Sequence, residues 1–200
     1  MESHPSPLRP DQQSILEIVA PGSTVLDLGC GTGELLASLV AQKQVKGQGI
    51  EIDDDAIFAC VKKGLNVFHD DIDRGLSEYH DHSFDYVILN QTFQQVKKPD
   101  DVLKEAMRVG RKVIVGFPNF ANLTTRIALG IRGRTPVTSS LPYDWHDTPN
   151  LHFFSILDFT DYCRKRNIAI ERGIFFNTRG QVRLFPNLRA ETAVLVLSGI

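Results

Sequence analysis

The feature that most constrains this chain is a glycine-rich turn between a buried strand and a helix. Residues 25–36 have the sequence VLDLGCGTGELL, so an apolar run ends at Gly29 and a helical pattern begins at Glu34. Glycine tolerates positive φ and lets a ligand approach the backbone where a Cβ would collide. The helix that follows presents unpaired amide groups at its N-terminus. This order of strand, turn and helix predicts a ligand-binding turn.

Two ligand classes use such turns, dinucleotides and S-adenosylmethionine (SAM). The dinucleotide fingerprint is G-x-G-x-x-G, whereas here Asp27 precedes Gly29, Gly31 and Gly33 in the pattern D-x-G-x-G-x-G. An acidic group at the turn opposes a pyrophosphate but tolerates a sulfonium and an ammonium group. The turn resembles motif I of the class I SAM-dependent methyltransferases. The resemblance implies that these residues bind SAM or S-adenosylhomocysteine, with Cys30 as a small side chain beside the cofactor.

The second predicted strand ends in another acidic position. Glu51 lies about 20 residues beyond the turn, where an acid can accept hydrogen bonds from both ribose hydroxyls. By resemblance to the methyltransferases, Ile52 would lie against the adenine. Asp53 is better explained as a helix cap than as a ligand contact.

Two further pairs of residues follow the third and fourth predicted strands. By the same resemblance, Asp71 would accept a hydrogen bond from the adenine amino group and Ile72 would pack on the ring. Asp70 competes with Asp71 for this assignment. The resemblance also places Asn90 and Gln91 near the methionine portion and the methyl group, although plain strand termination explains these two residues equally well.

Short apolar runs alternate with segments of helical period, which is typical of a three-layer α/β/α sandwich. Strands are predicted at residues 24–28, 47–52, 66–69, 84–90, 112–117, 168–176 and 193–197. Helices are predicted at residues 11–20, 34–42, 54–64, 99–109, 123–131 and 155–167. The chain of 200 residues is therefore expected to form one Rossmann-like domain, residues 1–200, with a mostly parallel seven-stranded sheet.

Residues 118–154 interrupt this alternation with a short helical piece and a long loop that contains several prolines. An insertion of this length in a compact domain is usually functional or disordered. The aromatic residues Tyr143 and Trp145 argue against disorder. We therefore expect a functional inserted segment.

The composition excludes several function classes. The formal net charge is -2 with interspersed signs, which argues against a nucleic-acid partner. No apolar stretch approaches the roughly 20 residues that span a bilayer, and no secretion signal is visible, so no membrane association is expected. The three cysteines form neither a disulfide framework nor a zinc pair, which favours the reducing cytoplasm. No histidine spacing indicates a metal site.

Several segments spread over nearly the whole chain are similar to one protein family. They are LRPD at 8–11, residues 25–36, 49–53 and 84–89 with 91–92 after them, FPNF at 117–120, RGRTPVT at 132–138, LPY at 141–143, Trp145, DTPN at 147–150 and His152. By these segments the chain resembles the MetW family of methionine-biosynthesis proteins. The resemblance implies a methyltransferase fold associated with the homoserine O-acyltransferase MetX, without an established methyl acceptor. The inserted segment then becomes the candidate partner surface, with a lid over the cofactor as the alternative.

Three functions remain compatible with the sequence. The resemblance favours a SAM-binding accessory protein that activates or regulates the homoserine O-acyltransferase. An active SAM-dependent methyltransferase acting on an unidentified small molecule is the alternative, and a dinucleotide-binding oxidoreductase has the wrong glycine spacing. Residues 90–93 read NQTF rather than the Asn-Pro-Pro-aromatic motif of amino-group methyltransferases, so no catalytic residue is assigned.

Overall fold

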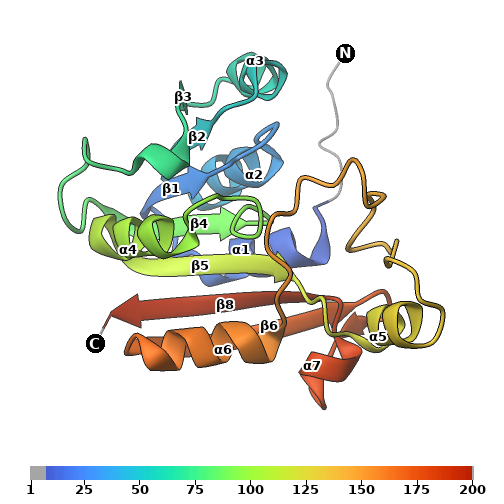
Figure 1. Cartoon of the computed structure of the whole chain (residues 1–200). Helices are drawn as coiled ribbons and strands as arrows, with labels where there is room; N and C mark the ends of the chain where they lie inside the picture. The colour runs from blue at the N-terminus through green and yellow to red at the C-terminus, as the bar shows by residue number, and fades with distance from the viewer. Residues whose placement is uncertain (1–7, 200) are drawn as a thin grey trace.

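Eight strands form one sheet in the computed structural model, which describes residues 8–199 (Figure 1). They are β1 Thr24–Leu28, β2 Lys46–Glu51, β3 Val67–His69, β4 Phe84–Asn90, β5 Gly110–Pro118, β6 Ile168–Asn177, β7 Gly180–Gln181 and β8 Thr192–Gly199. Their order in the sheet is β3-β2-β1-β4-β5-β8-β6-β7. Strands β1 to β5 pair in parallel, whereas β8 runs antiparallel to β5 and β6. The predicted mostly parallel α/β sheet is confirmed.

The prediction of seven strands is one strand short. Each of the seven predicted segments is a strand, with bounds that differ by at most two residues. The additional strand, β7, has two residues and pairs antiparallel with Phe176 and Asn177 at the end of β6. Gly180, with φ of 123°, allows the chain to turn back there. Two residues are too few to show any periodicity in the sequence.

Helices cover both faces of the sheet and make the three layers that the sequence predicts. They are α1 Pro10–Ile18, α2 Glu34–Lys43, α3 Asp54–Lys62, the 3-10 turn η1 Ile72–Arg74, α4 Pro99–Val109, α5 Leu123–Gly130, α6 Ile156–Lys165 and α7 Pro186–Arg189. Figure 1 shows α4 and α6 in front of the sheet and α1 and α2 behind it. The first seven residues, part of the segment in which the sequence predicts no secretion signal, lie outside the described residues.

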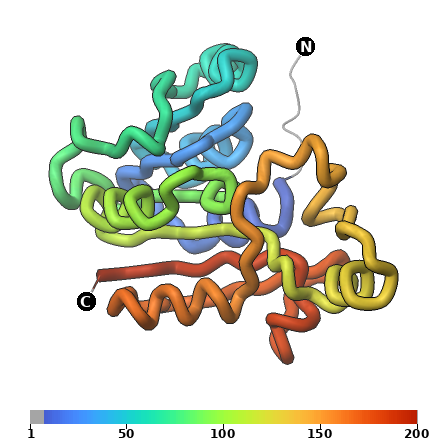
Figure 2. Tube along the Cα trace, viewed as in Figure 1, coloured from blue at the N-terminus to red at the C-terminus, as the bar shows by residue number. Residues whose placement is uncertain are grey.

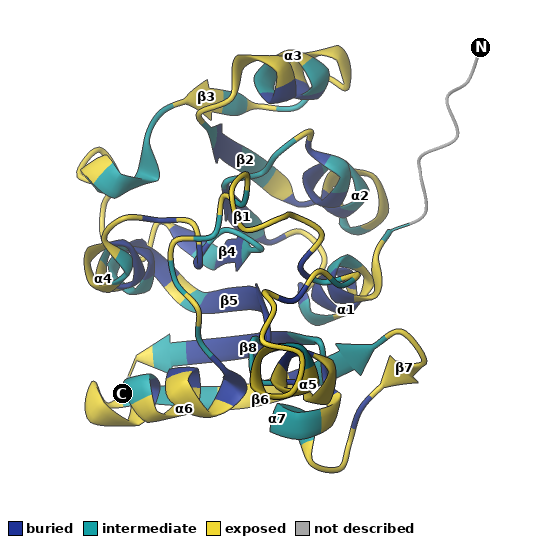
Figure 3. Ribbon diagram, turned by 45° about the vertical axis from the view of Figure 1, so that its right-hand side comes forward, coloured by how far each residue is buried: buried dark blue, intermediate teal, exposed yellow. Residues whose placement is uncertain are grey.

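Successive residues of the central strands point into two separate cores. In β4, Val87 and Leu89 belong to the cluster under α4 and α6, while Ile88 belongs to the cluster under α1 and α2. A strand covered on both faces has a nearly continuous apolar sequence, which explains why these strands could be predicted from the sequence. Figure 3 shows the buried residues concentrated in β1, β4, β5 and β8. None of the helices between residues 8 and 199 is both long and apolar enough to cross a bilayer.

The inserted segment begins where β5 ends and lies at the carboxyl edge of the sheet. It contains α5, which is capped by Asn122, because the Asn122 side chain accepts a hydrogen bond from the Thr125 amide at 3.0 Å. From residue 131 to the start of α6 the described chain has neither helix nor strand, yet it is attached to the loop after β4. The amides of Leu151 and His152 donate to the Gln94 carbonyl at 2.9 and 3.0 Å. Figure 2 shows this segment, in yellow and orange, running beside the start of α1.

The packing predicts a large stability loss for Phe117→Ala. Phe117 is fully buried, with its ring centroid 4.8 Å from that of Phe154 and 5.0 Å from that of Phe159. Its truncation should lower the free energy of unfolding by about 3 to 5 kcal/mol, measured by urea denaturation. The matched control is Phe58→Ala, because Phe58 is 60% exposed. Equal losses for the two variants would contradict this account of the core.

Candidate functional site

The sheet changes its direction of growth between β1 and β4, since β2 follows β1 on one side and β5 follows β4 on the other. Ligands of open α/β sheets bind outside the carboxyl ends of the strands at such a point. A cleft of about 590 Å³ opens there, and we refer to it as the cleft. Its walls come from the ends of β1 to β4, the start of α1 and the inserted segment.

Ten of the eleven predicted cofactor residues line this cleft. They are Asp27, Gly29, Cys30, Gly31, Glu51, Ile52, Asp71, Ile72, Asn90 and Gln91. Gly33 is not among the residues that line it. A Cβ at Gly33 would lie 2.5 Å from Cδ1 of Leu65 and 2.7 Å from Sγ of Cys60, so this glycine allows close packing at the start of α2.

The glycine turn offers an open backbone cradle at Gly31. Gly31 has φ of 55°, and a Cβ built on it would meet no atom within 4 Å. At Gly29, by contrast, a Cβ would come within 2.7 Å of the Thr92 side chain, so that glycine is needed for packing against the loop after β4. A ligand in the cleft can therefore reach the backbone at Gly31. This geometry fits the cofactor that the sequence motif predicts.

The Glu51 carboxylate joins the end of β2 to the turn after β1. Its Oε2 accepts a hydrogen bond from the Gly31 amide at 2.7 Å, and its Oε1 accepts from the amides of Ile52 and Asp53 at 2.8 and 3.1 Å. Each carboxylate oxygen has about two acceptor positions, so Oε2 is the oxygen with capacity left for a ligand hydroxyl. Asp53 caps α3 by accepting from the Ala56 amide at 2.8 Å, which confirms the cap interpretation.

Asp27 brings a buried carboxyl group to the cleft. Its side chain is almost fully buried, and desolvation together with the nearby Glu51 charge raises the pKa of Asp27 to about 7. A cation in the cleft would favour the ionised form of this group. Burial also raises the pKa of the Cys30 thiol, which disfavours the reactive thiolate.

The acidic pair after β3 is partly used to fix its own loop. Asp71 caps η1 by accepting from the Asp73 amide at 3.0 Å, and Asp70 accepts from the Asp71 amide at 2.7 Å. Both carboxylates line the cleft together with Ile52 and Ile72. The two isoleucines supply apolar surface on the side of the cleft where the adenine is predicted. Among the described residues, no group of three or more His, Cys, Asp or Glu side chains could hold a metal ion.

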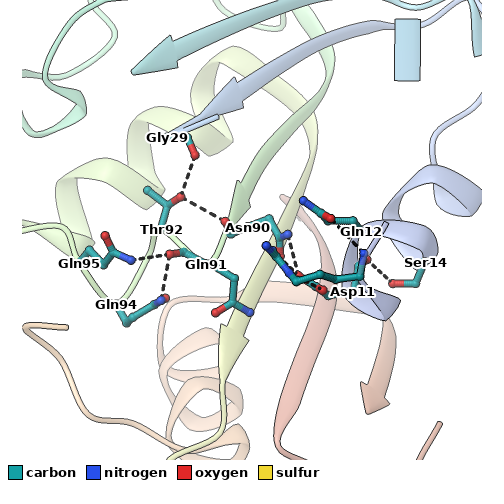
Figure 4. A network of polar contacts seen from close by, with 10 residues as sticks. Asp11, Gln12, Ser14, Gly29, Asn90, Gln91, Thr92, Gln94 and Gln95 are labelled. Carbon is teal, nitrogen blue, oxygen red and sulfur yellow. Dashed lines mark hydrogen bonds and ion pairs between the residues drawn. The ribbon is translucent and has the colours of Figure 1, made fainter. Parts of the chain in front are cut away.

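A polar network closes the cleft at the end of β4 (Figure 4). Gln91 has φ of 61°, a strained conformation for a residue other than glycine. It is held by its amide, which donates to the Gly116 carbonyl at 2.7 Å, and by its carbonyl, which accepts from the side chains of Gln94 and Gln95, each at 2.9 Å. The adjacent Asn90 donates from Nδ2 to the Asp11 carboxylate at 2.8 Å.

The sequence predicts no cleft residue on the first helix, and for the inserted segment it offers a lid over the cofactor only as an alternative, without identifying Tyr143 as a cleft residue. Arg9, directly before α1, and Gln12 on α1 line the cleft, and Tyr143 lines it from the inserted segment. The Arg9 guanidinium is held by the buried Asp11, with Nε 3.2 Å and Nη2 3.0 Å from its two carboxylate oxygens. The signal for Arg9 lies in the LRPD segment, one of the marks of the family resemblance.

Comparison with known proteins shows the family of the chain. A family profile described as "Methionine biosynthesis protein MetW" matches residues 9–197. The chain belongs to the MetW family. A bifunctional methionine biosynthesis protein MetXA/MetW from Rhodopirellula baltica is 38% identical over 212 residues, which cover 97% of this chain and 34% of the relative. This MetW-family chain therefore spans about a third of that relative's length.

Solved structures with the same fold include proteins with different activities. A SAM-dependent methyltransferase from Thermotoga maritima matches with a TM-score of 0.67 and 20% identity, covering 96% of this chain and 88% of that one. The cyclase SpnF matches with a TM-score of 0.69 and 15% identity, covering 94% and 80%. At these identities the likeness shows the fold, which is the class I methyltransferase fold, and leaves the reaction to the site.

The raised pKa of Asp27 predicts a pH dependence of stability that Asp27→Asn abolishes. The folded state holds this proton more tightly than the unfolded state, whose pKa is near 3.8. The resulting stabilisation is complete below that pH and is lost as the pH rises through about 7. Urea unfolding of the two proteins across this range should show wild type losing stability relative to the variant. Parallel curves would contradict the raised pKa.

Proposed function

We propose that this MetW-family chain binds SAM in the cleft and acts with a homoserine O-acyltransferase, whose activity it activates or regulates. The observation that carries the partnership is the relative that combines MetXA and MetW in one polypeptide. Fusion gives two modules a high effective concentration for each other, which is useful when they act together. The three cysteines are free, which supports the reducing cytoplasm as the place of action.

Different residues of the cleft contact the ribose, the adenine and the methionine portion of the proposed ligand. Gly31 meets the ligand through its backbone, and Oε2 of Glu51 accepts from a ribose hydroxyl. Ile52 and Ile72 cover the adenine ring, with Asp71 as acceptor for its amino group. Asp27 stabilises the positive charge of the methionine portion because its own ionisation is favoured by a nearby cation. When bound, SAM supplies an electrophilic methyl group on a sulfonium.

The inserted segment supports the partnership by exposing aromatic surface. Trp145 is 75% exposed and Phe153 is 63% exposed, values unusual for such large apolar side chains. Both border an apolar cavity of about 310 Å³ between α5 and the loop, lined also by Leu129 and Leu141. Exposed aromatic residues next to a pocket are typical of the anchor positions of protein interfaces.

Tyr143 connects this surface with the cleft, because it borders both the cleft and the apolar cavity. A ligand that contacts Tyr143 can therefore change the arrangement of the partner surface. By linkage, SAM then alters the affinity for the partner by the same factor by which the partner alters the affinity for SAM. Since SAM is made from methionine, this linkage would report the state of the pathway to the acyltransferase.

Ligand binding is tested with Gly31→Ala. The added Cβ would occupy the space in which the ligand reaches the backbone, so the affinity for S-adenosylhomocysteine should fall at least about tenfold in calorimetry. Gly22→Ala is the matched control, because Gly22 also has positive φ, at 74°, and open space around it. It lies before β1 and outside the cleft. Unchanged binding in Gly31→Ala, or no binding by the wild type, would refute the proposed ligand site.

The partnership is tested by combining the purified chain with the homoserine O-acyltransferase of the same organism. The wild type should co-elute with the enzyme and change its rate, and SAM should alter that effect. Trp145→Ala should weaken the complex by about 2 kcal/mol or more if this side chain is an interface anchor. Phe58→Ala, another exposed aromatic residue but on α3, should leave it unchanged. Absence of both co-elution and a rate effect in the wild type would eliminate the partnership.

A further inference from the structure

A second cavity of about 440 Å³ adjoins the cleft and has a wall of its own. It shares Arg9, Gln91, Gln95 and Tyr143 with the cleft. Its remaining residues come from the start of α1, the loop after β4, the inserted segment, the end of β6 and the start of β8, and include Gln94, Ser139, Ser140, Phe176 and Glu191. Five parts of the chain that are distant in sequence thus converge on one space beside the strained Gln91.

Gln94, one of the residues that line this cavity, has a buried hydrogen-bond acceptor without a partner. Its side chain is almost fully buried, and Oε1 accepts no hydrogen bond from the described residues. The orientation of the carboxamide is fixed, because Nε2 donates to the Gln91 carbonyl at 2.9 Å and an exchanged amide would set two oxygens against each other. Buried acceptors are nearly always satisfied in folded proteins. A ligand with a hydrogen-bond donor would satisfy this one.

The charges around the cavity favour a cation. Arg9 and Asp11 pair through two hydrogen bonds, so their charges offset each other. Glu191 accepts from the Ser139 hydroxyl at 2.9 Å and takes part in none of the ion pairs between described residues. Glu191 also borders a neighbouring cavity with three arginines, again without an ion pair. Its negative charge is therefore available to a ligand in the second cavity.

We infer that the second cavity binds a small protonated amine. The ammonium group donates to Oε1 of Gln94 and is attracted by the Glu191 carboxylate, while the rings of Tyr143 and Phe176 provide aromatic surface that accepts a cation. A neutral alcohol of the same size would lack the charge, and a carboxylate would be repelled by Glu191. The site lies next to the proposed SAM cleft and does not depend on SAM being its ligand.

The inference is tested by nuclear magnetic resonance titration with n-butylammonium, n-butanol and n-butyrate. Only n-butylammonium should shift the side-chain amide signals of Gln94 in the wild type. Glu191→Gln keeps the shape and the Ser139 contact but removes the charge, so it should weaken binding about tenfold. Glu171→Gln is the matched control, because Glu171 lies on β6, pairs with Lys112 and borders neither the cleft nor the second cavity.

A second titration separates this cavity from the acidic cleft. With S-adenosylhomocysteine at saturation, n-butylammonium should still shift the Gln94 signals, and Glu191→Gln should bind S-adenosylhomocysteine like the wild type. The inference fails if n-butylammonium does not bind, if Glu191→Gln and Glu171→Gln bind it equally, or if S-adenosylhomocysteine displaces it. Lack of S-adenosylhomocysteine binding would instead refute the proposed cofactor and leave the amine titration interpretable.

Discussion

The hydrogen bond from the Gly31 amide to the Glu51 carboxylate fixes the geometry on which the rest of the site depends. It connects the turn after β1 to the end of β2 over a donor–acceptor distance of 2.7 Å. The Glu51 carboxylate also accepts hydrogen bonds from two further amides. Because these hydrogen bonds already hold the Glu51 side chain in place, the binding of a ligand to it would cost little additional side-chain entropy. The cost is that one carboxylate oxygen is already saturated, so the acid has less capacity for a ribose than its position in the sequence suggests.

The buried carboxyl group of Asp27 lowers the stability of the strand that leads into the same turn. A carboxyl group buried beside Glu51 with a pKa near 7 is unfavourable in its charged form, and an apolar residue would suit the strand better. Local rules of folding are violated mainly where function requires it. Gln91 at the end of β4 is a second locally unfavourable residue, because three hydrogen bonds hold its backbone in a conformation that residues other than glycine rarely adopt.

The elements with the strongest local signals could be predicted from the sequence, and contacts between distant segments could not. Helix α4 has its predicted bounds because Pro99 occupies its first turn and its apolar positions repeat at helical spacing. The role of Gly33 required the positions of Cys60 and Leu65, which only the packed fold supplies. The contact between Asp11 and Asn90 joins residues 79 positions apart, and no local pattern encodes it. The same holds for Tyr143, whose place at the cleft depends on the path of a loop without regular structure.

The fold alone leaves the reaction open, because proteins named as a methyltransferase and as a cyclase share it with this chain. In this chain the longest interruption of the strand and helix alternation is the inserted segment, which contributes Tyr143 to the cleft. Tyr143 on that segment borders the cleft, the second cavity and the apolar cavity at once. A ligand in one of these three spaces can change binding in the other two only if its affinity differs between alternative positions of the inserted segment. Because such coupling is reciprocal, a partner that fixes Tyr143 in one position would change the ligand affinity of the cleft and of the second cavity together.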